Sequence, residues 1–431
     1  MRRSRRAGVR AAATAAAAAI VATGLLTPLH APVAAADEHW VASWTASPTD
    51  ASFPLDAAFL PLPAVMAHQT LRMIITPHLG GSVLRIHLSN RFGLAPARFG
   101  DVTVGRDVSG TVAGLTPVTF GGHSAVTIPR GRDAVSDPVR LGFRAFDALA
   151  VSMYVPGLQS FPTKHWNANA TSRYSLPGSG DLTRATSDRN FAGTTQSWLY
   201  VDAVDVQAPQ ATSAIVAFGD SITDGWVAAN KLSFPVSTSI TDRNGRYPDD
   251  LQRRVDAAGL PLSIVNAGIG SNRLVSNGEP IMLGLSGVQR FAADALDQAG
   301  VSGVIVIEGI NDFGLPPQST TAARLIGGLA SLVAQAHAAG KRIWLGTLLP
   351  ASNAIVDGRT APTSEAKREL VNAWIRGQHL ADGVIDFDAA LRDPLHPTTL
   401  APAYSGPDHL HPNLAGYQAM ADAVDLAMLT H

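Results

Sequence analysis

The second half of the chain alternates short apolar runs with longer stretches of helical pattern. Such alternation is typical of a parallel sheet covered by helices, because each parallel strand needs a crossover connection. The expected strands are 213–218, 262–267, 302–308, 342–348 and 383–387. The expected helices are 247–258, 286–299, 319–339, 364–378 and 413–429. Ligands bind at the carboxyl ends of strands in these folds, so residues that follow the strands are the candidates for chemistry.

A candidate nucleophile follows the first apolar run. Residues 214–218 are apolar and fit a strand that is buried on both faces. Gly219 then permits a tight turn that delivers Asp220 and Ser221. A serine just past a strand can act as a nucleophile, or it can simply cap the next helix. This stretch alone does not separate the two interpretations.

Two later segments offer groups that stabilise an oxyanion. Residues 264–272 run from an expected strand into a glycine-rich turn, whose backbone N–H groups can face developing negative charge. Residues 304–312 form a third apolar run, with the amide side chain of Asn311 at its end. Both segments would reach the same edge of the sheet as Ser221, because parallel strands end together.

A candidate base and its acid lie near the C-terminus. Asp408 precedes His411 by three residues, directly ahead of a helix that Asn413 would cap. The same Asp-x-Leu-His-Pro pattern occurs fifteen residues earlier, at Asp393 and His396. We prefer the later pair because a convincing final helix begins just after it. Nucleophile, oxyanion donors, base and acid therefore occur in an order that one sheet can bring together.

These blocks resemble the SGNH hydrolase superfamily, the GDSL esterases and lipases, which is named for a Ser, a Gly, an Asn and a His. The matching positions are Ser221 in 219–222, the turn at 268–271, Asn311 in 309–312, and His411 with Asp408. All four blocks match in order over 213–431. The resemblance implies a three-layer αβα domain with a parallel sheet, and hydrolysis of carboxylic esters without a cofactor or metal.

The resemblance also implies a role for each matching residue. Ser221 would be the nucleophile, His411 the general base, and Asp408 the acid that holds the imidazole. The expected oxyanion donors are Ser221, Gly270, Ser271 and Asn311, with Asp220 and Gly268 as supporting residues. In two places the sequence departs from the family pattern. Ile222 replaces a leucine of similar size, and Ser271 stands where the family has a glycine, which is tolerated if the backbone there does not require glycine.

Residues 1–36 have the pattern of a secretory signal peptide. Arginines at the start precede an apolar, alanine-rich stretch and the small residues 34–36. A membrane anchor is the weaker interpretation, because a span needs about 20 strongly apolar residues. We therefore expect a secreted protein with no stable membrane anchor after cleavage. The export route, general secretory or twin-arginine, stays open.

The charge and cysteine content exclude several classes of protein. Removal of 1–36 takes away five arginines and no acidic residue, leaving 28 basic and 34 acidic residues and a net charge of about −6. No nucleic-acid partner is expected from such a chain. The sequence has no cysteine, which excludes disulfides and thiolate zinc sites.

Residues 37–205 differ from the rest of the chain. Short alternating segments such as 70–75, 82–88 and 149–155 are separated by glycine and proline clusters, which predicts an all-β, sandwich-like accessory domain. Residues 206–212 read as a linker to the catalytic domain at 213–431. The accessory domain could shape the active site or face carbohydrate, or it could only add stability. Its aromatic residues Trp166, Tyr174 and Trp198 would form either a sugar platform or part of a core.

The predicted function is a secreted serine esterase that acts on carbohydrate O-acetyl or O-acyl esters. A lipase or phospholipase that acts on lipid esters is the alternative within the same reaction class. A noncatalytic glycan-binding protein is the alternative from another class. The expected partner is thus a small-molecule, polysaccharide or lipid ester.

Overall fold

The computed structural model of the protein describes residues 38–430, except 52, 54, 64, 278–283, 316–319 and 356–361. The predicted signal peptide at 1–36 lies outside the described residues. Residues 37–431 group into one unit by their contacts. In the described part of the chain, no helix combines the length and the apolar character that a membrane span requires.

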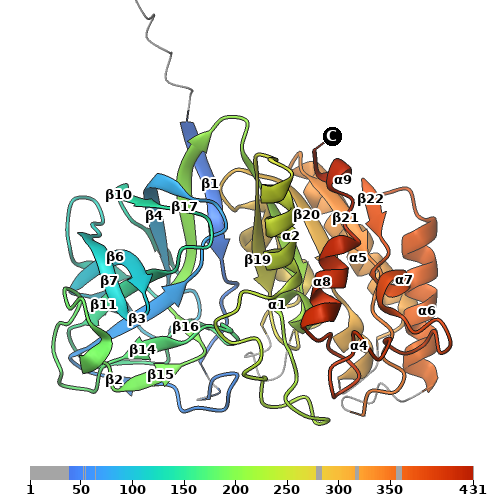
Figure 1. Ribbon diagram of the computed structural model, residues 1–431, viewed down its shortest axis with the longest axis horizontal. Helices are drawn as coiled ribbons and strands as arrows, with labels where there is room; N and C mark the ends of the chain where they lie inside the picture. The colour runs from blue at the N-terminus through green and yellow to red at the C-terminus, as the bar shows by residue number, and fades with distance from the viewer. Residues whose placement is uncertain are drawn as a thin grey trace, which may run out of the picture. The chain divides into compact units, whose positions relative to one another are not determined.

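The parallel sheet predicted for the second half is present. Its five strands lie in the order β19-β18-β20-β21-β22, and every neighbouring pair is parallel (Figure 1). The strands are β18 Ser213–Gly219, β19 Leu262–Gly268, β20 Val301–Ile307, β21 Arg342–Gly346 and β22 Gly383–Ile385. All five expected strands are found. Strand β18 lies between β19 and β20, so the segments that follow these three strands meet at one edge.

Helices connect and cover these strands. They are α1 Ser221–Asp224, α2 Tyr247–Ala257, α3 Gly287–Phe291, α4 Ile310–Gly314, α5 Ala322–Ala338, α6 Pro362–Gly377, α7 Phe387–Leu391, α8 Leu414–Asp422 and α9 Leu426–Thr430. Helices α2 and α8 pack together in front of the sheet in Figure 1, whereas α5 contacts α3 and α6. The longest helix, α5, begins at Thr321, whose side chain accepts a hydrogen bond from the Arg324 N–H.

Two expected helices differ from their pattern. The helix expected at 286–299 is shorter, because α3 continues directly into a π-helical turn at Ala292–Leu296 and ends there. The segment 413–429 breaks into α8 and α9. The Asp425 carboxylate accepts a hydrogen bond from the Ala427 N–H, and so caps a new helix where the sequence pattern suggested a continuous one.

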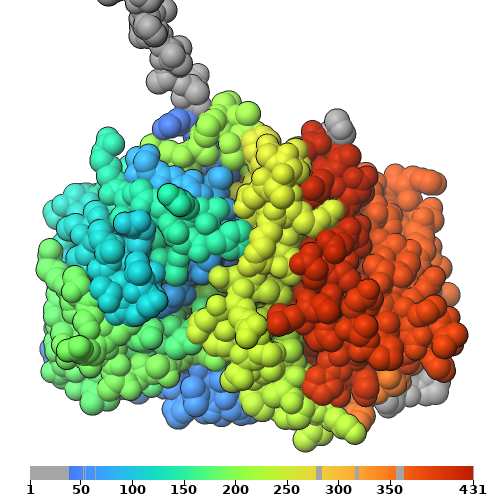
Figure 2. Space-filling model, viewed as in Figure 1, coloured from blue at the N-terminus to red at the C-terminus, as the bar shows by residue number. Residues whose placement is uncertain are grey.

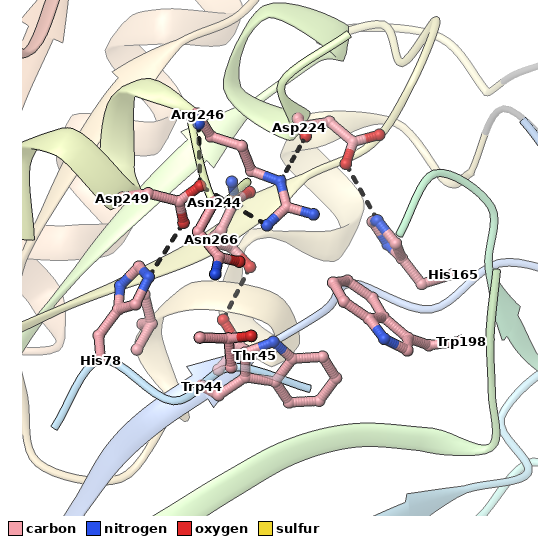
Figure 3. A pocket seen from close by; sticks show the side chains of 12 residues that line it. Trp44, Thr45, His78, His165, Trp198, Asp224, Asn244, Arg246, Asp249 and Asn266 are labelled. Atoms are coloured by element: carbon pink, nitrogen blue, oxygen red, sulfur yellow. Dashed lines mark hydrogen bonds and ion pairs between the residues drawn. The ribbon is translucent and has the colours of Figure 1, made fainter. Parts of the chain in front are cut away.

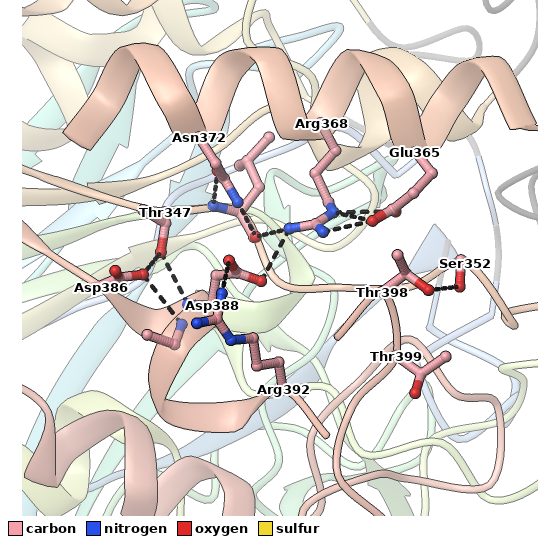
Figure 4. A network of polar contacts seen from close by, with 12 residues as sticks. Thr347, Ser352, Glu365, Arg368, Asn372, Asp386, Asp388, Arg392, Thr398 and Thr399 are labelled. Carbon is pink, nitrogen blue, oxygen red and sulfur yellow. Dashed lines mark hydrogen bonds and ion pairs between the residues drawn. The ribbon is translucent and has the colours of Figure 1, made fainter. Parts of the chain in front are cut away.

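A buried polar network fixes α6 against the end of β21 and against α7 (Figure 4). Arg368 donates to the Leu348 carbonyl and to Asp388, each at 3.0 Å, and pairs with Glu365. Asn372 donates to the same Leu348 carbonyl and accepts from the Leu348 N–H. Because each buried group has a partner, the network orders the loop that follows β21.

The first half of the chain is rich in β-structure, as predicted, and forms two antiparallel sheets. One has the order β1-β17-β4-β10, with β9 paired to β4; the other has the order β15-β14-β3-β11-β6-β7. The first sheet comprises β1 Glu38–Thr45, β4 Gly81–Ser89, β9 Asp133–Val135, β10 Val139–Phe143 and β17 Val201–Pro209. The second comprises β3 Gln69–Ile75, β6 Asp101–Val108, β7 Thr111–Pro117, β11 Leu149–Val155, β14 Ser172–Tyr174 and β15 Gly193–Thr195.

Short strands and one helical turn complete this β-rich region. The strands pair as β2 Val65–Met66 with β12 Gln159–Ser160, β5 Ala97–Phe99 with β8 Val126–Ile128, and β13 Lys164–His165 with β16 Trp198–Leu199. A 3-10 turn spans Asp188–Asn190. One hydrophobic cluster takes side chains from both large sheets, including Leu84 and Met73. The shared cluster explains why the alternating segments are apolar on one face.

The predicted linker is largely part of a strand. Residues 206–209 continue β17, where Val206 pairs with Val41 of β1 and with Leu84 of β4. Buried side chains continue along β17 past 205, at Val206 and Ala208, so the strand extends into the expected linker. Only 210–212 turn into β18.

The β-rich region and the α/β region share contacts along β1. The Ala42 N–H donates to the Ala299 carbonyl at 2.8 Å, and the Thr45 hydroxyl donates to the Asn266 carbonyl at 2.7 Å. Figure 2 shows atoms of the two regions lying directly against each other on this face. The α/β core also includes Trp166 and Ala208 from the β-rich region. The two regions therefore share part of one hydrophobic core.

We predict that Asp202 in β17 makes stability depend on pH. Burial, and then the nearby Asp133 carboxylate, raise the pKa of Asp202 to about 7, while His87 and Arg91 oppose the shift. The native state thus holds a proton on Asp202 that the unfolded chain releases above about pH 4. Folding should become less favourable as pH rises from about 4 to about 7, because the native state binds more protons.

Urea unfolding of Asp202→Asn across this pH window tests the prediction. The variant should lose part of the downward slope of unfolding free energy against pH. The exposed Asp297→Asn serves as the control and should keep the slope. An unchanged slope in Asp202→Asn would show that Asp202 is already ionised in the native protein.

Candidate active site

The turn after β18 presents Ser221. Asp220 caps α1, since its Oδ1 accepts a hydrogen bond from the Ile222 N–H at 2.9 Å. The helix cap is thus Asp220 and not Ser221, which leaves the serine side chain available for other contacts. Gly219 is required by packing, because a Cβ there would lie 2.3 Å from the Ile307 carbonyl oxygen and from the Thr223 hydroxyl.

Ser221, His411 and Asp408 form a continuous hydrogen-bonded chain. Ser221 Oγ lies 2.8 Å from His411 Nε2, and His411 Nδ1 lies 2.6 Å from Asp408 Oδ2. All three side chains are buried. The chain joins residues that are 190 positions apart in sequence, at the spacing that a nucleophile, base and orienting acid require.

Several donors surround the Asp408 carboxylate. Its Oδ1 accepts hydrogen bonds from the Leu410 and His411 N–H groups, and its Oδ2 accepts one from the Ser233 hydroxyl at 2.8 Å. Burial by itself raises the pKa of Asp408, but His411 and these donors outweigh it and hold the pKa well below its usual range. Asp408 is therefore ionised at neutral pH, and its Oδ2 can accept a hydrogen bond from an N–H at His411 Nδ1.

The earlier Asp-x-Leu-His-Pro copy forms a pair of its own at the surface. His396 Nδ1 lies 3.2 Å from Asp393 Oδ2, and the His396 side chain is 73% exposed, compared with 6% for His411. The motif alone thus orients a histidine toward its aspartate in both copies. Only the later copy reaches Ser221. His409, between the chosen pair, lies 3.4 Å from the Ser405 hydroxyl.

The turn after β19 corrects the predicted oxyanion donors. The Gly270 N–H donates to Asp224 Oδ2 at 3.1 Å, so Gly270 is a structural donor and not an oxyanion donor. Gly268 supports the turn, since a Cβ there would lie 2.2 Å from the Asp224 nitrogen. In the described part of the chain, the Ser221 and Ser271 N–H groups have no intramolecular acceptor. They remain suitable for a ligand oxygen.

Ser271 adopts a conformation that favours glycine. Its φ of 60° lies in the left-handed region, which costs a side-chain residue about 1–2 kcal/mol. The family's glycine at this position is thus explained by the backbone, and the serine keeps the same N–H at an energetic cost. Strain of this kind is often found at functional sites. Asn311 lies nearby, with its side-chain Nδ2 2.9 Å from the Asn272 carbonyl oxygen.

We predict different consequences for the two expected donors. Asn311→Ala removes a side-chain donor and should lower kcat by about 10²- to 10³-fold. Ser271→Ala keeps the backbone N–H and should change kcat by only a few fold. Steady-state kinetics on an activated ester would measure both. A loss of a hundredfold or more in Ser271→Ala would show that its hydroxyl, not its N–H, takes part.

Arg290 of α3 ties the ends of the central strands together. Its guanidinium donates to the Gly219 carbonyl, the Ala267 carbonyl and the Asn272 side chain, each at 2.8 Å. Its Nη2 also lies 3.3 Å from Glu308 Oε2. Burial, and then the nearby Asp220 carboxylate, raise the pKa of Glu308. Sequence reasoning missed Arg290, because one arginine in a helical segment gives no signal of the carbonyls it will meet.

The family assignment follows from comparison with known proteins. Residues 217–419 match the model of the GDSL-like Lipase/Acylhydrolase family. This part of the chain is a GDSL-like lipase/acylhydrolase domain. The match spans β18 through most of α8 and includes Ser221, Asn311 and the Asp408–His411 pair. A comparison with curated protein sequences gave no match.

Solved structures that are similar to this protein each cover about half of the chain. A carbohydrate acetylesterase from Sinorhizobium meliloti has 18% identity and a TM-score of 0.41, covering 51% of this chain and 100% of its own. An aryl esterase from M. smegmatis has 17% identity and a TM-score of 0.40, covering 49% and 96%. A GDSL-like lipase from Bacteroides thetaiotaomicron has 20% identity and a TM-score of 0.37, covering 50% and 88%.

The β-rich region contacts the turn of the GDSL-like domain that carries Ser221 (Figure 3). His165 Nε2 lies 3.0 Å from Asp224 Oδ1, and Asn169 donates to the Gly225 carbonyl at 2.8 Å. Arg246 donates to the Asp224 carbonyl at 3.0 Å and also bonds the Ala168 carbonyl. Residues 165–169 are therefore built into the turn that carries Ser221.

The aromatic residues considered for a sugar platform do not form one. Trp166 and Trp198 are buried, and the Trp198 indole N–H donates to the Ile74 carbonyl at 2.7 Å. Trp198 also packs edge to face on Trp44 at 4.8 Å. Tyr174 is half-buried in β14. Trp166 instead lies beside the GDSL-like domain's candidate site, stacked on Trp226 with ring centroids 5.2 Å apart.

The described residues contain no group of three or more histidine or acidic side chains that could hold a metal ion.

A small cavity opens onto Ser221 and His411. Its lining residues are Trp166, Ser221, Trp226, Ser233, Phe234, Gly270, Ser271, Asn311, Leu410 and His411. Ser221, His411 and the turn after β19 thus line one space.

Proposed function

We propose that the protein is a serine esterase that hydrolyses carboxylic esters through an acyl-enzyme intermediate on Ser221. The observation that carries the proposal is the chain from Ser221 Oγ through His411 to Asp408, with contacts of 2.8 and 2.6 Å. This arrangement opens onto a cavity that Ser271 and Asn311 also line. Nucleophile, base, acid and oxyanion donors thus converge where a carbonyl carbon can lie.

In the acylation step, His411 Nε2 accepts the Ser221 proton while Oγ attacks the ester carbonyl carbon. The ionised Asp408 holds the imidazole and stabilises the imidazolium that forms. The Ser221 and Ser271 N–H groups and the Asn311 amide stabilise the oxyanion, each contributing about 3 kcal/mol. Collapse of the intermediate breaks the bond to the alcohol oxygen, which takes the proton from His411.

In the deacylation step, the same groups act on water. His411 Nε2 accepts a proton from a water molecule that attacks the acyl carbon, and the tetrahedral oxyanion forms again at the same donors. When the intermediate collapses, Ser221 Oγ leaves and recovers its proton from His411. The products are the free carboxylic acid and the resting enzyme.

We propose carbohydrate O-acetyl or O-acyl esters as the substrate class, and export of the chain after removal of 1–36. A narrow cavity at Ser221 supports this class, because a small acyl group can enter while a bulky alcohol stays outside. Lipid esters are the alternative. They find some support in the exposed rings of Phe59 and Phe234, which pack together with centroids 5.8 Å apart.

A substrate panel tests the proposal. The purified protein would be assayed with p-nitrophenyl esters, acetylated xylan and a phospholipid. Release of acetate from xylan would support the carbohydrate class, and preference for the phospholipid would replace it with the lipid class. A protein that binds xylan but cleaves none of the three would contradict the esterase proposal and favour a glycan-binding protein.

A further inference from the structure

The cavity beside Ser221 is small. Its volume is about 20 Å³, room for only one or two water molecules. Four apolar side chains form part of its lining, namely Trp166, Trp226, Phe234 and Leu410. Trp166 is the only one of these four that belongs to the β-rich region. The space for a substrate group is therefore limited by a residue outside the GDSL-like domain.

Contacts on several sides hold Trp166 in place. Its indole N–H donates to the Leu55 carbonyl at 3.1 Å, and its own carbonyl accepts from the Ser197 hydroxyl at 2.7 Å. Its ring stacks on Trp226 and is only 4% exposed. The ring cannot turn aside without losing its hydrogen bond to Leu55 and its stacking on Trp226, so the wall it forms is held in place.

The position of Trp166 indicates which part of an ester it meets. The leaving alcohol oxygen must lie close to His411 Nε2, which returns the proton to it. Trp226 is the ring next to His411, with centroids 6.2 Å apart, and Trp166 lies one ring further away. A Cβ on Gly270 would lie 3.4 Å from Trp166 Cε3, so this ring borders the oxyanion turn. An acyl chain that leaves the carbonyl carbon on the side away from the alcohol would therefore meet Trp166.

We propose that Trp166 sets the acyl-chain limit of the enzyme and restricts it to acetyl and other very short acyl groups. The inference rests on the proposed esterase function and specifies its acyl specificity. It also gives the β-rich region a defined role, which is to supply one wall of the acyl pocket. The alcohol side is not limited by this residue.

The test compares acyl length at a constant leaving group. kcat/KM would be measured for p-nitrophenyl acetate, butyrate and octanoate with the full protein, Trp166→Ala and Trp166→Phe. The wild type should prefer acetate over octanoate by 100-fold or more. Trp166→Ala should narrow that preference at least tenfold by gaining activity on octanoate. Trp166→Phe removes less volume and should gain activity mainly on butyrate. It also serves as the test variant if Trp166→Ala does not fold.

Trp40→Ala is the matched control. Trp40 is a half-buried tryptophan of the same β-rich region, packed under Arg85 and absent from the cavity wall. It should leave the ratio of acetate to octanoate unchanged. A change in that ratio in Trp40→Ala would mean that general loosening, not the pocket wall, sets acyl length.

Failure of this inference is distinguishable from failure of the esterase proposal. A wild type that cleaves none of the esters, like Ser221→Ala, would overturn the proposed function. A wild type that cleaves octanoate as well as acetate, or a Trp166→Ala variant with the wild-type ratio, would overturn the inference alone. The inference would also be overturned if Trp166→Ala changed the preference among acetates of different alcohols but left the acyl preference unchanged.

Discussion

Ser221→Ala is expected to lower kcat for ester hydrolysis by about 10⁵- to 10⁶-fold, the loss seen when a catalytic serine is removed. The variant keeps the N–H of residue 221 and the whole cavity, so substrate binding should change little. Removal of one hydroxyl from a site that faces a cavity should not affect folding. Kinetics with an activated ester, together with substrate binding by calorimetry, would measure the two effects separately.

Ser352→Ala provides the control for this variant. Ser352 lies in the loop that follows β21, outside the cavity wall. Its hydroxyl donates a hydrogen bond to the Thr398 hydroxyl at 2.9 Å. Its loss should leave kcat within a few fold of the wild type. If Ser221→Ala kept more than a hundredth of the wild-type rate, the nucleophile would have to be another group.

His411→Ala should reduce kcat by a similar factor, about 10⁵- to 10⁶-fold, because nucleophile and base act as one unit. Without the imidazole, Ser221 has no group to accept its proton, and Asp408 is left as a buried carboxylate. The variant should therefore also be less stable than Ser221→Ala. Activity and urea unfolding would be measured side by side.

His396→Ala is a closely matched control. His396 lies in the earlier copy of the five-residue motif and is likewise paired with an aspartate. Its side chain is mostly exposed, and its loss should leave both activity and stability near wild type. If His396→Ala were inactive and His411→Ala active, the assignment of the two motifs would have to be reversed.

The strands of the α/β region could be predicted because local rules decide them. Residues 214–218 are apolar without interruption, as a strand buried on both faces must be, and Gly219 ends them. The break within the segment 413–429 is harder to predict. The helical pattern of the sequence continues through Asp425, although Asp425 caps a new helix there. The proline and glutamine of 206–209 favour a linker in the local sequence, whereas in the structure Val206 continues the strand.

The residues around the site were less predictable than Ser221, His411 and Asp408. The donors that hold Asp408 include Ser233, in a loop with no periodic pattern. Use of the Gly270 N–H by Asp224 depends on contacts between segments 46 positions apart. Trp166 reaches the cavity only because the β-rich region packs on the α/β region. Tertiary contacts of this kind leave no signal in a local stretch of sequence.

Covalent labelling with an alkyl fluorophosphonate, located by mass spectrometry of peptides, tests the central claim most directly. The reagent forms a stable bond with an activated serine and mimics the tetrahedral intermediate. One adduct per molecule is predicted, on the peptide that contains Ser221, with loss of activity in proportion and no labelling of Ser221→Ala or His411→Ala. An adduct on another residue, or full inactivation with Ser221 unmodified, would contradict the account.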